Sequence, residues 1–547
     1  MEPRADPEAD EGGGEPSQDD ASVQATPSDA SFDSGDADAE SDWPDAGDAG
    51  LGVVKGDELT IQLRPGVVHG QRVGNTRQFL GIPYAAPPVG ELRFQAPRPR
   101  EPWSDVFDAT RPGPMCMQSG PSFGRETSED CLSLNVYAPR ADSSVNRPVM
   151  VFIHGGGFLT GAGSEYDGST LSEAGGVIVV TLNYRLGALG FLHHAALDVA
   201  ALGPHTNQGL RDQQQALRWV HDNIVAFGGD PQQVTLFGES AGAISTCAHL
   251  VAKGSDGFAD RFIMESGNCA YGPLALQTKD YAIDVGNKVA AALCPGKDDV
   301  LACLRTLSSD QIAAQAIETT DPAVDGYYPF VDGDLFALAP SEAFKKGAFL
   351  RGDVMMGSNH AEWLLMQTLG QTTSPLNRTD LRNRITQYFS TDQAAQIQAH
   401  YVPVSDAEAG DAFLRLMTDA YFRCPARTLM RAMVSHGRKG YLYDFQVEPA
   451  AHALEVDYLF NMTAVSWLFP FSAPIPPTAS VVRAMQHYWT GFAEDGNPHP
   501  AGLPAWPGYD QDSDQNLVLA DTISTNSGLA RADCDFWAKL WGAASGP

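Results

Sequence analysis

Long hydrophobic runs are missing from this sequence of 547 residues, and basic residues are few. No segment approaches the roughly 18–20 uninterrupted apolar residues that a membrane-spanning helix needs, so we set aside a membrane-spanning protein. Lys and Arg number 36 against 68 Asp and Glu, which gives a net charge of −32. Because so acidic a chain would repel nucleic-acid phosphates, we also set aside a function in nucleic-acid binding.

Apolar residues are scarce in residues 1–51, which carry about half of the excess negative charge. Residues 1–50 contain 16 acidic residues, one basic residue and only two aromatic residues, Phe32 and Trp43. Such a segment buries too little apolar surface to offset the entropy of ordering it, so we expect a disordered acidic leader. Its simplest role is that of a solvated spacer for surface tethering, and an acidic tail that binds a partner is the alternative.

A secretion signal is missing as well, because the first residues include neither a basic region nor an apolar one. The eight cysteines nevertheless indicate an oxidising compartment, that is, the periplasm, the cell surface or the extracellular space. One hypothesis reconciles the two: Met1 replaces a removed signal, and the leader linked the rest of the chain to a cell-surface anchor. The sequence of the complete gene tests this hypothesis.

From residue 52 onward, short apolar runs alternate with stretches of helical spacing such as residues 209–224. Near-continuous runs rich in Val, Ile and Phe are typical of parallel strands that are covered on both faces. The runs cover residues 149–153, 177–182, 234–237, 262–264, 354–356 and 441–445. Because the alternation continues without a repeat or a linker, the sequence predicts one large doubly wound α/β domain, residues 52–547.

The motif GESAG, residues 238–242, stands between an apolar run and a helical pattern. In this strand–turn–helix setting, Gly-x-Ser-x-Gly places a serine hydroxyl at the carboxyl edge of the sheet and at a helix N-terminus. The helix dipole and the free N–H groups there favour developing negative charge. Ser240 is therefore predicted to be a nucleophile, and the alternative is a serine that caps a helix in a tight turn.

Three glycines follow the run 149–153, in the segment HGGGF of residues 154–158. Amides without side chains beside them approach a ligand oxygen closely, so with the Ala241 amide they would stabilise a tetrahedral oxyanion. We expect His154 to position this loop rather than to transfer protons. The alternative is a flexible glycine turn without a role in catalysis.

An acid and then a histidine follow a nucleophilic serine of this kind along the chain. Glu362 lies six residues after the run 354–356, whereas Asp353 precedes that run and belongs to the opposite edge of the sheet. Of the five later histidines, only His452 follows a strong strand by a short loop. The spacing therefore favours Glu362 and His452 as acid and base. The other four are interpreted as surface or capping residues: His400, His436, His487 and His499.

Taken together, these segments resemble the type B carboxylesterases, which include carboxylesterases, cholinesterases and bile-salt-activated lipases. The resemblance covers about residues 53–541 and extends to FLGIPYAAPPVGELRF (79–94), EDCLSLNVYAP (129–139), NYRLGALGF (183–191), GSNHAEW (357–363) and AAHALEVDYLF (450–460). It implies an α/β-hydrolase fold and a secreted enzyme of bacterial type. It also implies a small-molecule ester substrate and chemistry that needs no cofactor and no metal, and it leaves the oligomeric state open.

The resemblance also implies roles for individual residues. The triad consists of Ser240, Glu362 and His452. The amides of the oxyanion hole belong to Gly156, Gly157 and Ala241. Ser266 corresponds to a serine near the acid–base pair, and the structural ion pairs are Arg93 with Glu129 and Arg185 with Asp212. Three positions depart from the family pattern: Trp363 and Ala453 replace glycines beside the acid and the base, and Ser133 stands where Tyr or Thr is commoner.

The cysteines follow the same resemblance. It implies three disulfides, Cys116–Cys131, Cys294–Cys303 and Cys424–Cys534, and leaves Cys247 and Cys269 as candidates for a fourth. Metal ligation is the weaker alternative, because none of these spacings is that of a zinc finger.

We therefore expect a serine ester hydrolase that acts through an acyl-enzyme on short-to-medium acyl or aryl esters. The 14 residues between Cys116 and Cys131 lack the tryptophan that holds a quaternary ammonium group in cholinesterases, which argues against choline esters. An interfacial lipase is one alternative, and a non-catalytic binding relative is another, although the complete triad argues against it. The candidate pocket walls, which are equally compatible with ordinary core positions, are Phe123, Phe158, Glu239, Tyr327, Tyr328 and Trp363.

Overall fold

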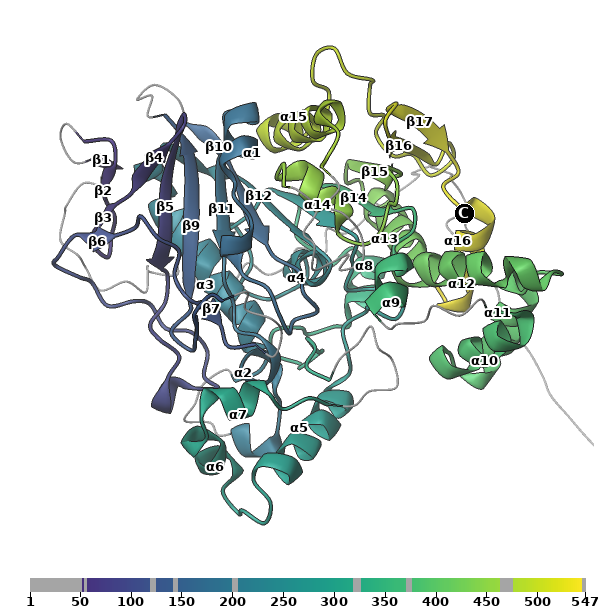
Figure 1. Ribbon diagram of the computed structural model, residues 1–547, viewed down its shortest axis with the longest axis horizontal. Coiled ribbons are helices and arrows are strands. Elements are labelled where there is room, and N and C mark those ends of the chain that lie inside the picture. Colours follow the sequence, from purple (N-terminus) through teal and green to yellow (C-terminus); the bar gives the residue numbers. More distant parts are fainter. Residues whose placement is uncertain are drawn as a thin grey trace, which may run out of the picture. The chain divides into compact units, whose positions relative to one another are not determined.

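An eleven-stranded sheet organises the chain in the computed structural model (Figure 1). The structure describes residues 52–53, 57–118, 124–140, 146–198, 205–317, 326–369, 376–462 and 476–543. The expected acidic leader, residues 1–51, and the candidate pocket residue Phe123 lie outside these residues.

The central strands of the sheet are parallel. Seven neighbouring strands run in one direction, in the order β16-β15-β14-β13-β12-β10-β11, and antiparallel strands flank them on both sides. Their bounds are β10 Arg147–Ile153, β11 Ile178–Leu182, β12 Gly229–Glu239, β13 Arg261–Glu265, β14 Asp353–Asn359, β15 Gly440–Phe445 and β16 Gln515–Leu519. The first six contain the six apolar runs, except that β11 begins one residue after the start of the run 177–182, so these predicted strands are confirmed. The flanking strands are β4 Gln71–Val73, β5 Thr76–Pro83, β9 Ser133–Pro139 and β17 Ser524–Ser527.

Short strands form two further small sheets that the sequence pattern did not predict. Each of these strands has only two or three residues, which is too few to produce a recognisable alternation of apolar and polar residues. One sheet consists of β1 Gly52–Val53, β2 Thr60–Gln62, β3 Val67–His69 and β6 Phe107–Asp108, and the other pairs β7 Met115–Cys116 with β8 Thr127–Ser128.

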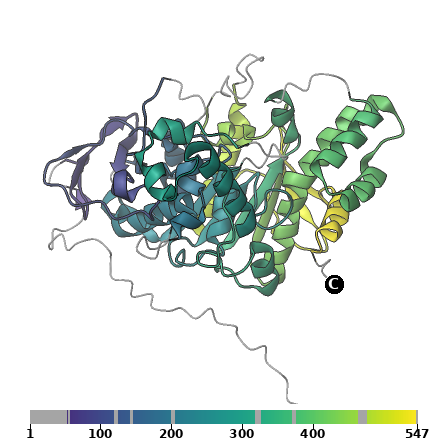
Figure 2. The ribbon, with the colours of Figure 1, turned by 90° about the horizontal axis from the view of Figure 1, so that it is seen from below.

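Sixteen α-helices accompany the sheets in the described part of the chain. The predicted helix 209–224 is confirmed as α3. The bounds are α1 Ser169–Gly175, α2 Gly187–Phe191, α3 Gln208–Asn223, α4 Ala241–His249, α5 Lys279–Leu293, α6 Val300–Thr306, α7 Ser309–Ala313, α8 Pro340–Lys346, α9 Trp363–Leu369, α10 Arg378–Tyr388, α11 Thr391–Tyr401, α12 Ala409–Thr418, α13 Cys424–Ser435, α14 Leu454–Leu459, α15 Ala479–Asp495 and α16 Arg531–Leu540. Figure 2 shows α10 and α11 at the end of the sheet opposite β1–β6.

Two hydrophobic cores lie on the two faces of the large sheet, because successive side chains of a strand point to opposite faces. In β10, Val149, Val151 and Ile153 belong to the core that also includes residues of α3, α4 and α13, whereas Met150 and Phe152 belong to the core that includes residues of α1, α14 and α15. Both faces are therefore buried, which is why the strands are almost uninterruptedly apolar. Among the described residues, no helix combines the length and the apolar character needed to cross a membrane.

All eight cysteines are paired. The disulfides are Cys116–Cys131, Cys247–Cys269, Cys294–Cys303 and Cys424–Cys534, which include the candidate fourth pair. Cys247 lies on α4, the helix that begins after Ser240, and Cys269 follows β13. This bridge therefore ties the helix behind the predicted nucleophile to the neighbouring strand.

The disulfide that spans the most residues and the one that spans the fewest are expected to differ in their effect on stability. Replacing Cys424 and Cys534 by alanine removes a bridge across 110 residues, and chain entropy predicts a loss of about 5 kcal/mol in the free energy of unfolding. The same replacement of Cys294 and Cys303, which are nine residues apart, predicts about 2.5 kcal/mol. Urea unfolding followed by tryptophan fluorescence measures both losses. Equal losses would contradict the entropic account.

Candidate active site

Ser240 occupies a sharp turn between β12 and α4. Its backbone has φ +53° and ψ −119°, a sparsely populated conformation that residues other than glycine rarely adopt. The flanking glycines are required by close packing, because a Cβ on Gly242 would lie 1.9 Å from the Ile153 carbonyl oxygen and one on Gly238 would lie 2.6 Å from it. The turn therefore packs directly against the end of β10, as the GESAG motif predicts.

The three-glycine loop lies beside this turn. A Cβ on Gly155 would stand 2.6 Å from Glu239 Oε2 and 3.2 Å from the Cβ of Ser240. Gly156 and Gly157, which follow it, have positive φ and are exposed. The Ala241 amide is the first of α4, where N–H groups have no partner within the helix. Gly155 and Ala241 thus lie directly beside Ser240, with Gly156 and Gly157 next along the chain from Gly155.

His154 contacts the glycine loop and the neighbouring Tyr184. Its ring stacks on Tyr184 at 4.5 Å between centroids. Its Nδ1 lies 2.8 Å from the carbonyl oxygen of Gly155, and the neutral tautomer with its proton on Nδ1 donates a hydrogen bond to that oxygen. Burial lowers the pKa of His154 to about 4, so the ring is uncharged at neutral pH. These contacts agree with the positioning role expected for His154.

Glu362 and His452 meet although they are 90 residues apart. His452 Nδ1 lies 2.6 Å from Glu362 Oε2, and both side chains are buried. The other oxygen of Glu362 accepts a 2.6 Å hydrogen bond from the amide of Asn359, the last residue of β14. The Ala361 amide donates to the Ala450 carbonyl at 2.9 Å, which joins the loop of the acid to the loop of the histidine.

Glu239 lies on the other side of the imidazole. Its Oε1 stands 3.2 Å from His452 Nε2, and among the hydrogen bonds of the described residues none joins Ser240 Oγ to that nitrogen. Burial alone would lower the pKa of His452, but the carboxylates of Glu239 and Glu362 raise it to about 9. Burial raises the pKa of Glu239, and the charge of a protonated His452 opposes that rise, so Glu239 is favoured as a carboxylate when the imidazole carries its proton. The imidazole therefore sits between two carboxyl groups.

Behind the acid–base pair lies a hydrogen-bond chain that the sequence did not reveal beyond Ser266. Ser266 Oγ donates to Glu455 Oε1 at 2.7 Å, and Asn359 Nδ2 donates to the other oxygen of Glu455. Burial and the nearby Glu362 raise the pKa of Glu455 to about 7. A positional signal exists in hindsight: Glu455 lies three residues after His452, and Asn359 lies three before Glu362.

Two more buried carboxyl groups enlarge this acidic cluster. Glu265 accepts a 3.1 Å hydrogen bond from Trp489 Nε1, and burial raises its pKa well above the usual range. Burial and Glu455 raise the pKa of Asp457 to about 7. Burial therefore favours the neutral, protonated form of these carboxyl groups, and the groups that raise the pKa of His452 most are Glu239 and Glu362, which contact its ring.

Of the candidate pocket residues that the structure covers, Tyr327 is the one that lines the cavity described below. Tyr327 lines a cavity of about 120 Å³, together with apolar residues that include Leu159, Leu186 and Ile317. Phe158 and Tyr328 are buried and pack against each other at 5.1 Å, while Trp363 packs against Tyr421 at 4.7 Å. Because these three are buried, their positions are compatible with the core as well as with a pocket wall, so their role stays a prediction, and Glu239 faces the histidine.

The two implied ion pairs are present near the site. Arg93 makes a two-point contact with Glu129, with Nε 2.7 Å from Oε2, and Arg185 Nη2 lies 2.7 Å from Asp212 Oδ1. Arg185 and Asp212 are both buried, and Arg185 also donates to the Gln95 carbonyl at 2.8 Å. In the described part of the chain, neither pair forms a hydrogen bond or ion pair with a triad residue.

Comparison with known proteins decides the family. The model of the carboxylesterase family matches residues 57–537. The chain belongs to the carboxylesterase family. A para-nitrobenzyl esterase of Bacillus subtilis (strain 168) is 34% identical over 484 residues, which cover 85% of this chain and 95% of the relative. Carboxylesterase 5A of Felis catus is 32% identical over 528 residues, covering 89% and 92%. Pyrethroid hydrolase Ces2e of Rattus norvegicus is 34% identical over 516 residues, covering 88% of each chain.

Membership in the carboxylesterase family confirms two expectations from the sequence. The fold is that of an α/β-hydrolase, with the large mostly parallel sheet described above. The chain is a carboxylic ester hydrolase, as are the carboxylesterases it resembles over most of its length.

Proposed function

We propose that this carboxylesterase cleaves its substrate with a Ser240–His452–Glu362 triad and an acyl-enzyme intermediate. The observation that carries the proposal is the buried 2.6 Å contact between His452 Nδ1 and Glu362, which fixes the imidazole tautomer. The strained turn that holds Ser240 at a helix N-terminus supports it independently.

The proposed reaction begins with attack of Ser240 Oγ on the ester carbonyl carbon. The serine proton passes to His452 Nε2, and the amides of Gly156, Gly157 and Ala241 donate to the oxyanion, each worth about 2.7–4 kcal/mol of barrier. The intermediate collapses as His452 returns the proton to the departing alkoxide, which leaves as alcohol. Water then attacks the acyl-enzyme by the same route and releases the carboxylic acid.

The buried carboxyl groups have a defined part in this proposal. The imidazolium that forms when Ser240 attacks would lie between Glu362 and Glu239, whose negative charges stabilise it. Before attack, the ring must swing its Nε2 from Glu239 toward the adjacent Ser240, a contact that commonly tightens only once substrate is bound.

Replacing Glu239 by Gln tests whether its carboxylate stabilises the imidazolium of His452. A carboxylate beside an imidazolium raises the pKa of His452, so removing the charge lowers that pKa and frees the base at lower pH. The acid limb of the kcat/KM profile is therefore expected to move down by about one pH unit. Glu342→Gln, which removes an exposed carboxylate on α8, is the control and leaves the limb in place. An unmoved limb in Glu239→Gln would show that this carboxyl does not act on the base.

We further propose short-to-medium acyl or aryl esters as the substrate class. The cavity of about 120 Å³ with mostly apolar lining, which includes Leu159 next to the glycine loop, supports a small apolar group. An interfacial lipase is the second candidate function, because a lipase would use the same triad.

Hydrolysis of p-nitrophenyl esters from acetate to palmitate distinguishes an esterase from an interfacial lipase. The proposal predicts a maximum at short or medium chains and saturation below the solubility limit of the ester. A lipase would instead become more active above that limit and prefer the long chains. Butyrylthiocholine, offered in the same assay, is expected to be a poor substrate.

We also propose that the enzyme works outside the cytoplasm, with residues 1–51 as a disordered tether. The four disulfides support an oxidising compartment. Removal of residues 1–51 is then expected to leave kcat/KM and the unfolding midpoint unchanged. A clear loss in either quantity would show that the leader is part of the folded enzyme.

A further inference from the structure

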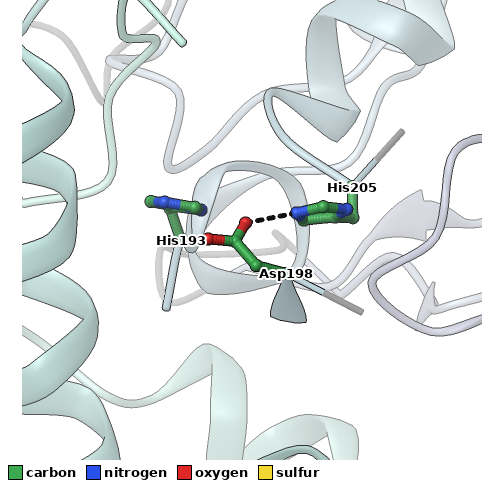
Figure 3. Close-up of side chains that lie close together, drawn as sticks. All are labelled: His193, Asp198 and His205. Carbon is green, nitrogen blue, oxygen red and sulfur yellow. Dashed lines mark hydrogen bonds and ion pairs between the residues drawn. The ribbon is translucent and has the colours of Figure 1, made fainter. Parts of the chain in front are cut away.

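Away from the triad, two histidines and an aspartate converge beside the start of α3 (Figure 3). His193 and Asp198 flank a short 3-10 turn, Ala195–Leu197, and His205 lies two residues before the cap of α3. One ligand atom from each of the three residues lies within 4.8 Å of the other two. Figure 3 shows the Asp198 carboxylate between the two rings, with Oδ1 2.5 Å from His205 Nε2.

His193 is the unusual member of this cluster. Its side chain is 1% exposed, and both of its ring nitrogens are buried without a hydrogen-bond partner among the described residues. A buried polar group without a partner costs free energy, so such a group calls for an explanation, and an unseen ion is one. Packing holds it in place: its carbonyl oxygen lies against Gly286 of α5, where a Cβ would stand 1.8 Å away, and Phe330 lies 5.1 Å from its ring.

Two carboxylates near His193 would attract a cation. Asp198 and Asp332 lie near its ring, and Lys279, an exposed residue at the start of α5, is the opposing positive charge. Asp332 is fixed by Thr206 and by Asn207, whose Nδ2 donates to it at 3.0 Å. Two imidazoles and one carboxylate are a donor set that suits zinc and related divalent metals, whereas magnesium and calcium prefer oxygen ligands alone.

We propose that His193, Asp198 and His205 bind one divalent transition-metal ion, with zinc as the ion that this donor set fits best. Three protein ligands leave a fourth tetrahedral position for water. The ion would join the loop after α2 to the start of α3 and hold it against Phe330. Because the ester chemistry proposed above uses no metal, the role of this site is to stabilise the fold.

Zinc titration of the full chain by calorimetry, after dialysis against a chelator, tests the site. We expect one zinc ion per chain and, with cobalt in its place, the visible absorption bands of four-coordinate Co²⁺. His193→Ala and His205→Ala are expected to weaken zinc binding at least about 100-fold and to abolish those bands. Zinc is also expected to raise the unfolding midpoint of the wild-type chain but not that of the two variants.

His400→Ala is the matched control. His400 Nε2 contacts Asp533 at 2.7 Å, so it forms the same kind of His–Asp pair, and the described residues supply no third ligand there. This control should bind zinc as the wild-type chain does. Equal zinc binding by the wild-type chain and the less buried variant His205→Ala would overturn the proposal, because the metal would then bind elsewhere. So would a wild-type chain that binds no zinc or gives no cobalt bands.

Discussion

Replacing Ser240 by alanine is expected to lower kcat for p-nitrophenyl butyrate about 10⁵-fold while the chain remains folded. The hydroxyl is the atom that forms the acyl-enzyme, and no neighbouring group takes its place at the end of β12. The small residual rate would come from binding and from the oxyanion-hole amides, which the substitution leaves in position. The helix α4 keeps its packing, because the Ile244 amide bonds to the backbone oxygen of residue 240 and not to its side chain.

Ser245→Ala provides the control for this loss. Ser245 lies one turn further along α4 and donates to the Ala241 carbonyl at 2.9 Å, away from the proposed reacting atoms. Its replacement costs about 1–3 kcal/mol of stability, because Gln213 Nε2, which donates to Ser245 Oγ at 3.1 Å, also loses its acceptor, and kcat should stay within a factor of a few. Steady-state kinetics together with urea unfolding of both variants distinguish lost chemistry from lost folding. A Ser240→Ala enzyme with wild-type kcat would refute the nucleophile.

Replacing Glu362 by glutamine is expected to lower kcat by about 10³–10⁴-fold. The amide keeps the shape of the carboxylate, but it can donate to His452 Nδ1, which places the ring proton on Nε2. In that tautomer Nε2 has no lone pair to accept the serine proton, and the imidazolium has lost a neighbouring negative charge. KM should change little, because Glu362 is fully buried and does not reach the substrate.

Asp353→Asn is the matched control for the acid. Asp353 begins the same strand, β14, that leads to Glu362, but it lies at the opposite edge of the sheet. Its replacement is expected to leave kcat unchanged. If Glu362→Gln retained wild-type kcat, the acid would have to be another member of the buried cluster, with Glu239 or Glu455 as the next to test.

The parts of the fold that the sequence predicted share one physical cause. The six central strands are buried on both faces, so burial alone dictates an uninterrupted apolar run in each. The Ser240 turn is equally local, since Gly238 and Gly242 are dictated by contact with the end of β10. The contact of Glu362 with His452 was predicted by chain order and by the strand that precedes each loop.

What the sequence did not reveal depends on contacts between distant segments. Ser266 directly follows β13, Asn359 ends β14 and Glu455 lies on α14, so their hydrogen-bond chain exists only once these three segments are side by side, and the sequence pointed to Ser266 alone. The contact of Glu239 with His452 is of the same kind. Aromatic residues pose a different problem: Phe158 and Trp363 are apolar whether they pack in a core or line a pocket, so their type does not separate the two roles.

Stoichiometric labelling with diethyl p-nitrophenyl phosphate, a reagent that phosphorylates an activated serine, tests the central claim most directly. The proposed triad predicts that one diethylphosphoryl group per chain appears on Ser240 by peptide mass spectrometry, with release of one p-nitrophenolate and a matching loss of esterase activity. The Ser240→Ala chain should take up no label. A label on another residue, or an enzyme that remains fully active once Ser240 is labelled, would contradict the account.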